Sequence, residues 1–225
     1  MALAPAPGDA MSEPRVVHLI RHGQSDFEAS DFRESPRGRQ WDPPLSPIGR
    51  EQAKLLTARL VLLRRIAAVY CSPFRRARET IAPFAERTDT EVRYEEDLGE
   101  AFAGAWEAAS FEELLAGDEE MLQRFRDQEP MWSLAPGAES IHDLRARVRA
   151  VIERSLAKNA EGDVVLVAHG GVINAYVGPL LGIQQEMFYL PENTSLNTVI
   201  ADGAQRRVRF LNDVRHLTEP HLFRG

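Results

Sequence analysis

Three short apolar runs constrain the fold of this chain more than any other feature. They cover Val16–Ile20, Ala67–Cys71 and Val164–Ala168, and β-branched residues are frequent in them. Runs of this kind are typical of strands that are buried on both faces of a parallel sheet. Three weaker runs are further strand candidates: Glu91–Tyr94, Leu196–Ala201 and Arg207–Leu211. The chain is therefore predicted to build a central sheet with layers packed on both sides.

Helical patterns separate these strands. Ser46 offers an N-cap with Pro47 at the first helical position, and Ser110 precedes Glu113 in a capping-box arrangement. A third helix is predicted to start after Ser140, because apolar residues then recur at helical spacing. Strands that alternate with helices indicate crossover connections over a mainly parallel sheet. In such a sheet, the ligand crevice lies beyond the carboxyl ends of the strands.

Polar clusters follow each of the three apolar runs. They read "RHGQS", "CSPFRRARET" and "HGGVI" in chain order. Because parallel strands end at the same edge of a sheet, these clusters are expected to converge there. Arg21 and His22 come from the first cluster, whereas Arg76 and His169 come from the second and third. Guanidinium groups bind phosphate oxygens as bidentate donors, and glycines let the backbone approach closely. The sequence therefore predicts a phosphate site.

One carboxylate completes a plausible reaction centre. Glu100 lies in "EEDLGEAFAGAWE", a segment rich in glycine and alanine that is predicted to be a loop. Phosphoryl transfer needs an in-line nucleophile, stabilised equatorial oxygens and a proton for the leaving oxygen. A neutral imidazole can attack phosphorus without prior deprotonation, and a protonated carboxyl group can supply the proton. Glu100 is the best candidate for that acid by its loop context.

The length and composition indicate one globular domain. The chain has 225 residues, of which 44% are hydrophobic and 27% are charged, enough for a single sizeable core. Residues 14–225 are predicted to form one catalytic domain, and residues 1–13 a disordered N-terminal extension whose first ten residues need not be native. The net charge of -7 argues against a general nucleic-acid or anionic-membrane surface.

The sequence also predicts a cytoplasmic location. Cys71 is the only cysteine, so no intrachain disulfide can form, which fits a reducing compartment. No apolar run approaches the roughly 18 to 20 residues that cross a bilayer. The opening "MALAPAPGDA" lacks the basic start and apolar stretch of a signal peptide.

Six segments in order resemble the signatures of a known enzyme family. They are "LIRHGQS", "DPPLSPIGREQA", "SPFRRARET", "LGEAFAGAWE", "PGAES" and "VLVAHGGVI". The chain resembles the phosphatase branch of the histidine phosphatase superfamily, also called phosphoglycerate mutase-like, from about Val16 to Asn212. The resemblance implies a three-layer α/β/α sandwich around a mainly parallel mixed sheet. It also implies catalysis without a metal ion or another cofactor.

The resemblance implies a role for several residues of these motifs. His22 would be the nucleophile that becomes phosphohistidine, and Glu100 would be the general acid and later the base for water. The phosphoryl group would be held by Arg21, Arg76, His169 and the N–H of Gly170. A metal-independent phosphomonoesterase acting on a small-molecule phosphate ester is the function expected from these roles.

One motif departs from the family pattern. The family usually carries Asn six positions after the nucleophilic histidine, where this chain has Glu28, and Phe27 replaces the usual Trp. A carboxylate cannot donate to phosphate unless it is protonated, so either Glu28 points away or another residue takes that role. The segment "SDFRESPRGRQWD" is longer than expected and offers Arg33, Arg37 and Arg39 as donors. Arg39 is the one predicted to bind substrate.

Two other functions compete with hydrolysis. A cofactor-dependent phosphoglycerate mutase would share His22, but it needs a site closed to water. Residues 101–136, which are 36 residues between Glu100 and Gly137, leave a lid shorter than in the mutases. A non-catalytic module that binds phosphorylated ligands would be expected to have lost His22 or Arg76. The sequence identifies neither the physiological substrate nor the oligomeric state.

Several other residues are given ordinary structural interpretations. His18 is expected to be a core or edge histidine rather than a metal ligand, because its HxxxH spacing lies on a strand. Cys71 is expected to be buried, since Ala77 stands where a cysteine-dependent phosphatase needs arginine. Phe102 and Trp106 are expected to pack around the Glu100 loop. Three further assignments are a site contact for Asn193 and solvated positions for Arg75 and Arg78.

Overall fold

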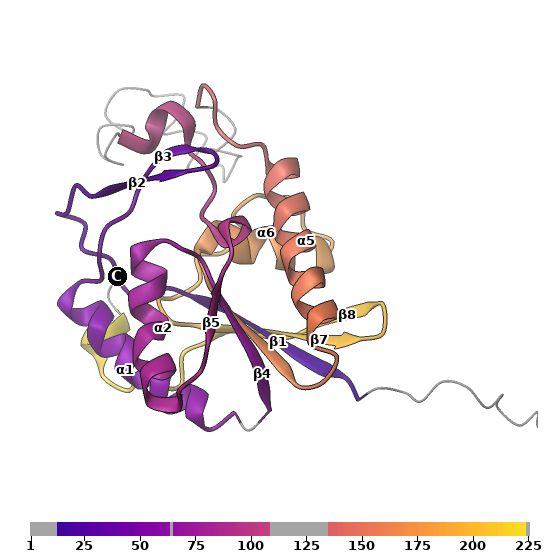
Figure 1. Ribbon diagram of the computed structural model, residues 1–225. Helices are drawn as coiled ribbons and strands as arrows, with labels where there is room; N and C mark the ends of the chain where they lie inside the picture. The colour runs from indigo at the N-terminus through magenta and orange to yellow at the C-terminus, as the bar shows by residue number, and fades with distance from the viewer. Residues whose placement is uncertain (1–12, 64, 109–134, 224–225) are drawn as a thin grey trace, which may run out of the picture.

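A six-stranded mixed sheet forms the centre of the protein (Figure 1). The computed structural model describes residues 13–63, 65–108 and 135–223. The strands lie in the order β5-β4-β6-β1-β7-β8. Their bounds are Arg15–Arg21 (β1), Ile66–Cys71 (β4), Val92–Tyr94 (β5), Asp163–Ala168 (β6), Leu196–Asp202 (β7) and Gln205–Asp213 (β8). β5, β4, β6 and β1 are parallel, whereas β7 and β8 are antiparallel to their neighbours. All six predicted strands are confirmed.

Helices cover both faces of this sheet, as Figure 1 shows. One face carries α1 (Pro47–Val61) and α2 (Arg75–Thr88), and the other carries α5 (Ile141–Lys158) and α6 (Gly170–Leu180). Side chains of β6 alternate between the two cores. Val165 and Val167 pack with the α1 and α2 side, whereas Leu166 packs with the α5 and α6 side. The predicted three-layer α/β/α sandwich is therefore confirmed.

Two of the helices begin at the predicted caps. The hydroxyl of Ser46 accepts the N–H of Gly49 at 3.0 Å, and Pro47 takes the first helical position of α1. The hydroxyl of Ser140 accepts the N–H of Asp143 at 3.1 Å at the start of α5. The predicted capping box at Ser110 lies outside the described residues, as does nearly all of the proposed extension over residues 1–13. No helix in the described ranges is long and apolar enough to cross a membrane.

A hairpin that the sequence does not predict lies over the carboxyl edge of the sheet. It consists of β2 (Phe32–Ser35) and β3 (Gly38–Trp41), which Figure 1 places beyond the end of β1. These strands are short and highly polar, so their pattern gives no strand signal. The turn needs Gly38 because its φ is +130° and the Phe102 ring fills the space of a side chain. Three short 3₁₀ helices complete the described structure: Glu96–Leu98 (η1), Gly104–Ala108 (η2) and Pro220–Phe223 (η4).

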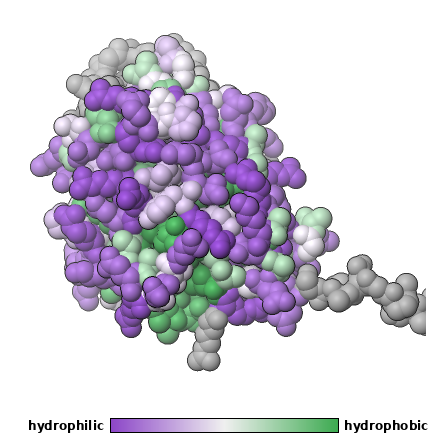
Figure 2. All heavy atoms as spheres, viewed as in Figure 1, coloured by the Kyte–Doolittle hydropathy of each residue, from purple (hydrophilic) through white to green (hydrophobic). Residues whose placement is uncertain are grey.

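The hydrophobic residues are largely enclosed between the layers. Tyr70 and Phe74 are among the largest side chains that are fully buried. The face of the molecule in Figure 2 is mainly hydrophilic, and hydrophobic residues gather toward the lower part of that view. Phe27 is an exception near the carboxyl edge, because 68% of it is exposed while its ring stacks on Trp41.

Candidate active site

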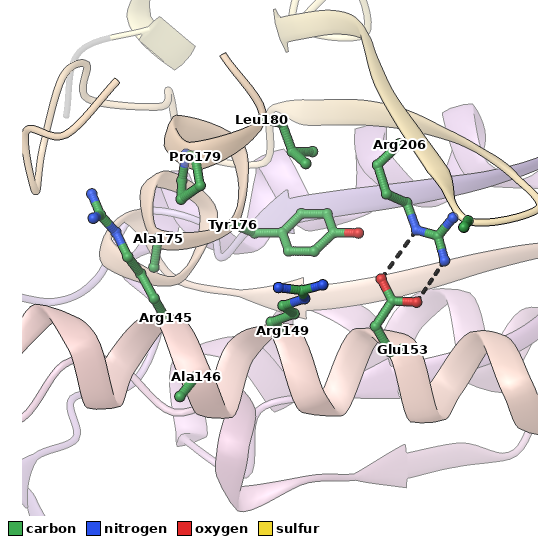
Figure 3. A pocket seen from close by; sticks show the side chains of 10 residues that line it. Arg145, Ala146, Arg149, Glu153, Ala175, Tyr176, Pro179, Leu180 and Arg206 are labelled. Carbon is green, nitrogen blue, oxygen red and sulfur yellow. Dashed lines mark hydrogen bonds and ion pairs between the residues drawn. The ribbon is translucent and has the colours of Figure 1, made fainter. Parts of the chain in front are cut away.

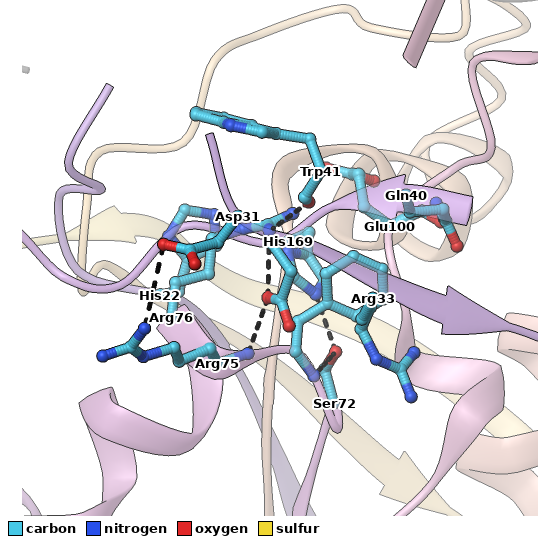
Figure 4. A network of polar contacts seen from close by, with 12 residues as sticks. His22, Asp31, Arg33, Gln40, Trp41, Ser72, Arg75, Arg76, Glu100 and His169 are labelled. Carbon is cyan, nitrogen blue, oxygen red and sulfur yellow. Dashed lines mark hydrogen bonds and ion pairs between the residues drawn. The ribbon is translucent and has the colours of Figure 1, made fainter. Parts of the chain in front are cut away.

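Three strand ends bring the predicted groups to one edge of the sheet (Figure 4). Arg21 is the last residue of β1, and His22 follows it directly. Arg76 lies in the first turn of α2, after β4, and His169 caps α6 directly after β6. The ring centroids of His22 and His169 are 5.1 Å apart. The parallel arrangement of β4, β6 and β1 is what makes these clusters neighbours.

The His22 imidazole is buried, and the backbone fixes its tautomer. Nδ1 lies 2.7 Å from the carbonyl oxygen of Gly23, and because a carbonyl only accepts, Nδ1 carries the proton. Nε2 therefore keeps its lone pair, which accepts a hydrogen bond from Nε of Arg76 at 3.3 Å. Burial, followed by the charges of Arg76 and Arg21, holds the pKa of His22 well below its usual value. The ring is thus uncharged at neutral pH.

Close backbone packing holds the turn that carries His22. A Cβ atom on Gly23 would lie 2.8 Å from the carbonyl oxygen of Gly49 in α1, so only glycine fits. The N–H of Gly23 donates to the Thr80 hydroxyl of α2 at 2.9 Å. Nδ2 of Asn193 donates to the carbonyl oxygen of His22 at 3.0 Å. The predicted site contact of Asn193 is therefore made, through the backbone of His22.

Arg76 is a buried cation anchored beside His22. Its Nη1 donates to the carbonyl oxygen of Trp41 at 3.1 Å and lies 3.6 Å from Oδ1 of Asp42. Its guanidinium carbon lies 4.7 Å from the centre of the Phe74 ring. Burial lowers the pKa of Arg76 to about 10, although the negative charge of Glu100 acts in the opposite direction. The guanidinium therefore stays charged at neutral pH in a poorly solvated place.

Arg21 supplies the second guanidinium of the cluster. Its Nη1 donates to the carbonyl oxygen of Pro191, and its buried Nε has no hydrogen-bond partner among the described residues. Burial lowers the pKa of Arg21, and Glu100 and Glu192 oppose that shift. Because Glu100 acts on both Arg21 and Arg76, its carboxylate lies near both cations. An anion among these groups would find donors that the protein itself does not satisfy.

His169 is fully buried and presents an unused nitrogen. Its Nε2 lies 2.7 Å from the hydroxyl of Ser72, which also accepts the N–H of Phe74 at 3.4 Å. If Ser72 donates to Nε2, the proton of His169 sits on Nδ1, for which the described residues provide no partner. Burial, followed by the charge of Arg76, lowers the pKa of His169 far below its usual value. A buried unpaired donor costs about 1–3 kcal/mol, so a ligand is its natural partner.

Glu100 is held by one backbone N–H group of its own loop and one at the start of α6. Its Oε1 accepts the N–H of Ala101 at 2.9 Å, and its Oε2 accepts the N–H of Gly171 at 3.2 Å. Gly171 has no room for a side chain, because a Cβ atom there would overlap Oε1 and lie 3.2 Å from Cδ of Glu100. Nε2 of Gln40, from the hairpin, lies 3.5 Å from the carbonyl oxygen of Glu100. Figure 4 shows Gln40 and Glu100 next to each other, to the right of the His22 ring.

Arg147 of α5 fixes the loop that carries Glu100, and sequence reasoning missed it. Its guanidinium donates to the carbonyl oxygens of Asp97, Gly99 and Glu100 at 2.7, 2.9 and 3.2 Å. A buried ion pair with Glu139, at 2.6 Å, completes its contacts. The signal available in the sequence was its spacing, three residues after Leu144 and four before Val151, which puts an arginine on the apolar side of a helix. Glu139 belongs to the "PGAES" signature.

Not all of the other residues considered as substrate contacts reach the buried cluster. Arg39 is not brought to the cluster, because its exposed guanidinium lies 4.5 Å from the centre of the Phe32 ring. Its neighbour Gln40 points to the opposite face of β3 and takes the buried position. Glu28 is exposed, so the structure places it away from the buried groups. Gly170 opens α6 directly after His169, and its contact with phosphate stays a prediction.

The structural interpretations of several other residues are confirmed. His18 is a buried strand histidine whose Nδ1 lies 3.2 Å from the Thr198 hydroxyl, and burial lowers its pKa to about 4. Cys71 is a buried free thiol. Arg75 and Arg78 are exposed on α2. Within the described ranges, no three side chains of His, Cys, Asp or Glu gather closely enough to hold a metal ion.

Comparisons with known proteins agree with this geometry. Residues 17–214 match the family model of the histidine phosphatase superfamily (branch 1). "Phosphoserine phosphatase 1" of Hydrogenobacter thermophilus is 29% identical over 206 residues, which are 89% of this chain and 93% of that protein. "Probable phosphoglycerate mutase GpmB" of Photorhabdus laumondii is 29% identical over 215 residues, covering 92% of this chain and 96% of that protein. A solved mycobacterial glucosyl-3-phosphoglycerate phosphatase in complex with VO3 has a TM-score of 0.72 at 28% identity, covering 88% of this chain and 98% of that one.

Proposed function

Because this chain belongs to the histidine phosphatase superfamily (branch 1), we propose that it hydrolyses small-molecule phosphate monoesters through a phosphohistidine formed on His22. The observation that carries the proposal is the protonation state of the His22 ring. Its Nδ1–H is committed to a carbonyl oxygen, so the lone pair of Nε2 faces Arg76 in a buried, cationic site. The enzyme class, a phosphoric monoester hydrolase, agrees with the names of its phosphatase relatives.

In the first step, Nε2 of His22 attacks phosphorus in line with the ester oxygen. The N–P bond forms as the P–O bond breaks, and Glu100 gives its proton to the leaving alcohol. Arg21 and Arg76 bear the charge of the equatorial oxygens, and His169 donates from Nδ1. Preorganised donors of this kind are usually the largest single contribution to such catalysis.

In the second step, water attacks the phosphorus of phosphohistidine. The carboxylate of Glu100 takes the proton from water as the new P–O bond forms. The N–P bond breaks, its electron pair returns to Nε2 of His22, and inorganic phosphate leaves. Each proton and bond is thereby returned to its starting place. Gly171 and Arg147 keep Glu100 in position for both steps through the contacts at its carboxylate and its backbone.

The substrate class proposed is a phosphate ester that carries a second anionic group. Phosphoserine and glucosyl-3-phosphoglycerate, which appear in the names of the relatives, both contain a carboxylate near the ester. In this chain, Arg33 from the hairpin lies 4.9 Å from the centre of the Phe74 ring, the same ring that Arg76 covers at 4.7 Å. A third guanidinium therefore lies near the phosphate site, although Glu96 binds it now.

A direct test compares His22→Ala with a surface control. His142→Ala removes a histidine that is exposed on α5, so it should keep wild-type hydrolysis of 4-nitrophenyl phosphate, phosphoserine and 3-phosphoglycerate. His22→Ala should abolish all three activities. Wild-type-like rates in His22→Ala would refute the mechanism, whereas a bound but unreacted ester in the wild-type protein would indicate the non-catalytic alternative.

A mutase activity is the second candidate, because one relative is named as a phosphoglycerate mutase. Both activities share His22 and differ only in whether water or an organic alcohol receives the phosphoryl group. Measuring phosphate release against isomerisation of 3-phosphoglycerate separates them. We expect release to dominate; isomerisation without release would assign the chain to the mutases.

We further propose that the enzyme works in the cytoplasm and does not act on nucleic acid. The support is a single buried thiol and a net charge of -7. Fractionation of cells of the source organism, with an antibody against the chain, tests the location. Recovery outside the cytoplasmic fraction would contradict it.

A further inference from the structure

A groove away from the catalytic cluster lies between α5, α6 and the turn that joins β7 to β8 (Figure 3). Its volume is about 710 Å³, within the range of sites that hold small organic molecules. Arg145 and Arg149 line it from α5, Tyr176 and Pro179 from α6, and Arg206 from β8. None of these five side chains belongs to the phosphate site described above.

The groove carries positive charge that the surrounding protein does not neutralise. Arg145, Arg149 and Glu153 follow each other at intervals of four along α5, so they share one helix face. Glu153 is already bound by Arg206 through two parallel contacts, one of them at 3.0 Å. Arg145 donates only to the neutral oxygens of Gln184, at 3.3 and 2.8 Å, in the described part of the chain. Arg149 is exposed and has no ion-pair partner among the described residues.

The placement of Arg145 and Arg149 on one helix face is unfavourable without a ligand. Like charges four residues apart destabilise a helix by about 0.2–0.5 kcal/mol, and Arg145 and Arg149 are such a pair. The local excess of two cations stands in a chain whose net charge is -7. An anion between the two guanidinium groups would convert the repulsion into attraction.

A second, independent feature points to a ligand in the same place. Tyr176 is only 5% exposed, and its buried hydroxyl makes no well-formed hydrogen bond within the described structure, although the Arg206 guanidinium lies close to it. Figure 3 shows this hydroxyl directed toward the Arg206–Glu153 pair, which also lines the groove. Burial, followed by the negative charge of Glu153, raises the pKa of Tyr176 to about 12, so the group remains an O–H donor. An unsatisfied buried hydroxyl in a native fold calls for a partner.

The rest of the groove is apolar. Ala146, Ala175, Pro179 and Leu180 also line it. We propose that this groove binds a small organic anion whose charged group lies among Arg145, Arg149 and the Tyr176 hydroxyl, with its aromatic or aliphatic body on Pro179 and Leu180. The site is separate from the proposed phosphatase activity and does not depend on it.

An anionic aromatic dye, 8-anilinonaphthalene-1-sulfonate, has the required chemistry and reports binding by fluorescence. The dye is titrated into the full-length protein with orthovanadate present, so that the phosphate site is occupied. We expect one site per chain, and a dissociation constant at least tenfold higher in the double variant Arg145→Gln, Arg149→Gln. Tyr176→Phe should weaken binding several-fold, because it removes one hydrogen bond. Arg207→Gln is the matched control, since Arg207 is exposed on β8 and absent from the groove.

Three results would overturn the site. One is an unchanged dissociation constant in the double variant while circular dichroism shows it folded. Another is equal weakening by Arg207→Gln, which would indicate a general charge effect. The third is a dimer in analytical ultracentrifugation that excludes the dye and dissociates in the double variant, because a second copy would then cover the groove. Hydrolysis of 4-nitrophenyl phosphate should be unchanged in all these variants, which separates failure of this site from failure of the phosphatase.

Discussion

Replacing Gly171 by alanine tests the position of Glu100, the proposed catalytic acid, with the smallest possible change. A Cβ atom at Gly171 would overlap Oε1 of Glu100 and lie 3.2 Å from its Cδ. Because favourable contacts between heavy atoms begin near 3.5 Å, the carboxylate must retreat by about 1 Å. A displacement of that size at a reacting group costs about 100-fold in rate, or about 2.7 kcal/mol of transition-state free energy.

The loss should depend on the leaving group. With phenyl phosphate, whose leaving oxygen needs a proton, kcat/KM should fall about 100-fold in Gly171→Ala. With 4-nitrophenyl phosphate, whose leaving group departs unprotonated, the fall should be much smaller. The parameter kcat/KM is the right readout, since it reports steps up to phosphorylation of His22 and not the later attack of water.

The neighbouring glycine provides the control. A Cβ atom at Gly170 would meet Met187 at 3.6 Å and Pro191 at 3.9 Å, which are ordinary contacts. Gly170→Ala should therefore keep wild-type kcat/KM, and both variants should keep or gain stability, because alanine favours the helix by up to about 1 kcal/mol. The reasoning would be refuted if Gly171→Ala lost nothing, or if both variants lost equally on both esters.

Three further predictions follow from the contacts of the site. Glu100→Gln should reduce kcat/KM on phenyl phosphate far more than on 4-nitrophenyl phosphate; equal losses would exclude Glu100 as the acid. Arg147→Met should lower the free energy of unfolding by about 3–5 kcal/mol in urea titrations, because Glu139 is left buried without its partner, and the same leaving-group dependence should appear. The stability should also fall from pH 6.5 to pH 4, since burial lowers the pKa of His18 to about 4 and the unfolded chain takes up the proton first. His18 alone contributes up to about 3 kcal/mol to that loss, so a His18→Gln variant that kept the full pH dependence in urea titrations would contradict this assignment.

The sheet and the catalytic cluster could be predicted from the sequence because one physical rule links them. Parallel strands with buried faces read as apolar runs, and their carboxyl ends share an edge, so the residues after each run meet. The same rule predicts that His22, Arg76 and His169 lie together, as they do in the structure. The caps at Ser46 and Ser140 were equally readable, because a hydroxyl before a helix satisfies N–H groups that the helix itself leaves unpaired.

The parts that could not be predicted depend on polar contacts between distant segments. The hairpin of Phe32–Ser35 and Gly38–Trp41 has no apolar alternation, and it is held by contacts such as that of the Trp41 N–H with Glu107. The sequence could not say which arginine of this segment faces inward, since that depends on the register of four-residue strands. Arg39 therefore lies outside the cluster, whereas Arg33 approaches Phe74.

The contacts of Arg147 are a second example that the sequence could not predict. Its partners are backbone carbonyl groups of residues about 50 positions earlier in the chain, and backbone acceptors leave no trace in residue types. The exposed Glu28 illustrates the reverse case. The sequence shows that Glu28 stands where the family usually has Asn. Only the fold shows that the Glu28 side chain lies in solvent.

The central claim is that Nε2 of His22 becomes the phosphorylated atom. The most direct measurement is a rapid acid-free quench during turnover of an aryl phosphate, followed by ³¹P NMR and peptide mapping of the labelled chain. The account predicts a single phosphoramidate at Nε2 of His22, since Nδ1 is bonded to the Gly23 carbonyl. A label at Nδ1, at His169 or as a stable ester on Ser72 would contradict it.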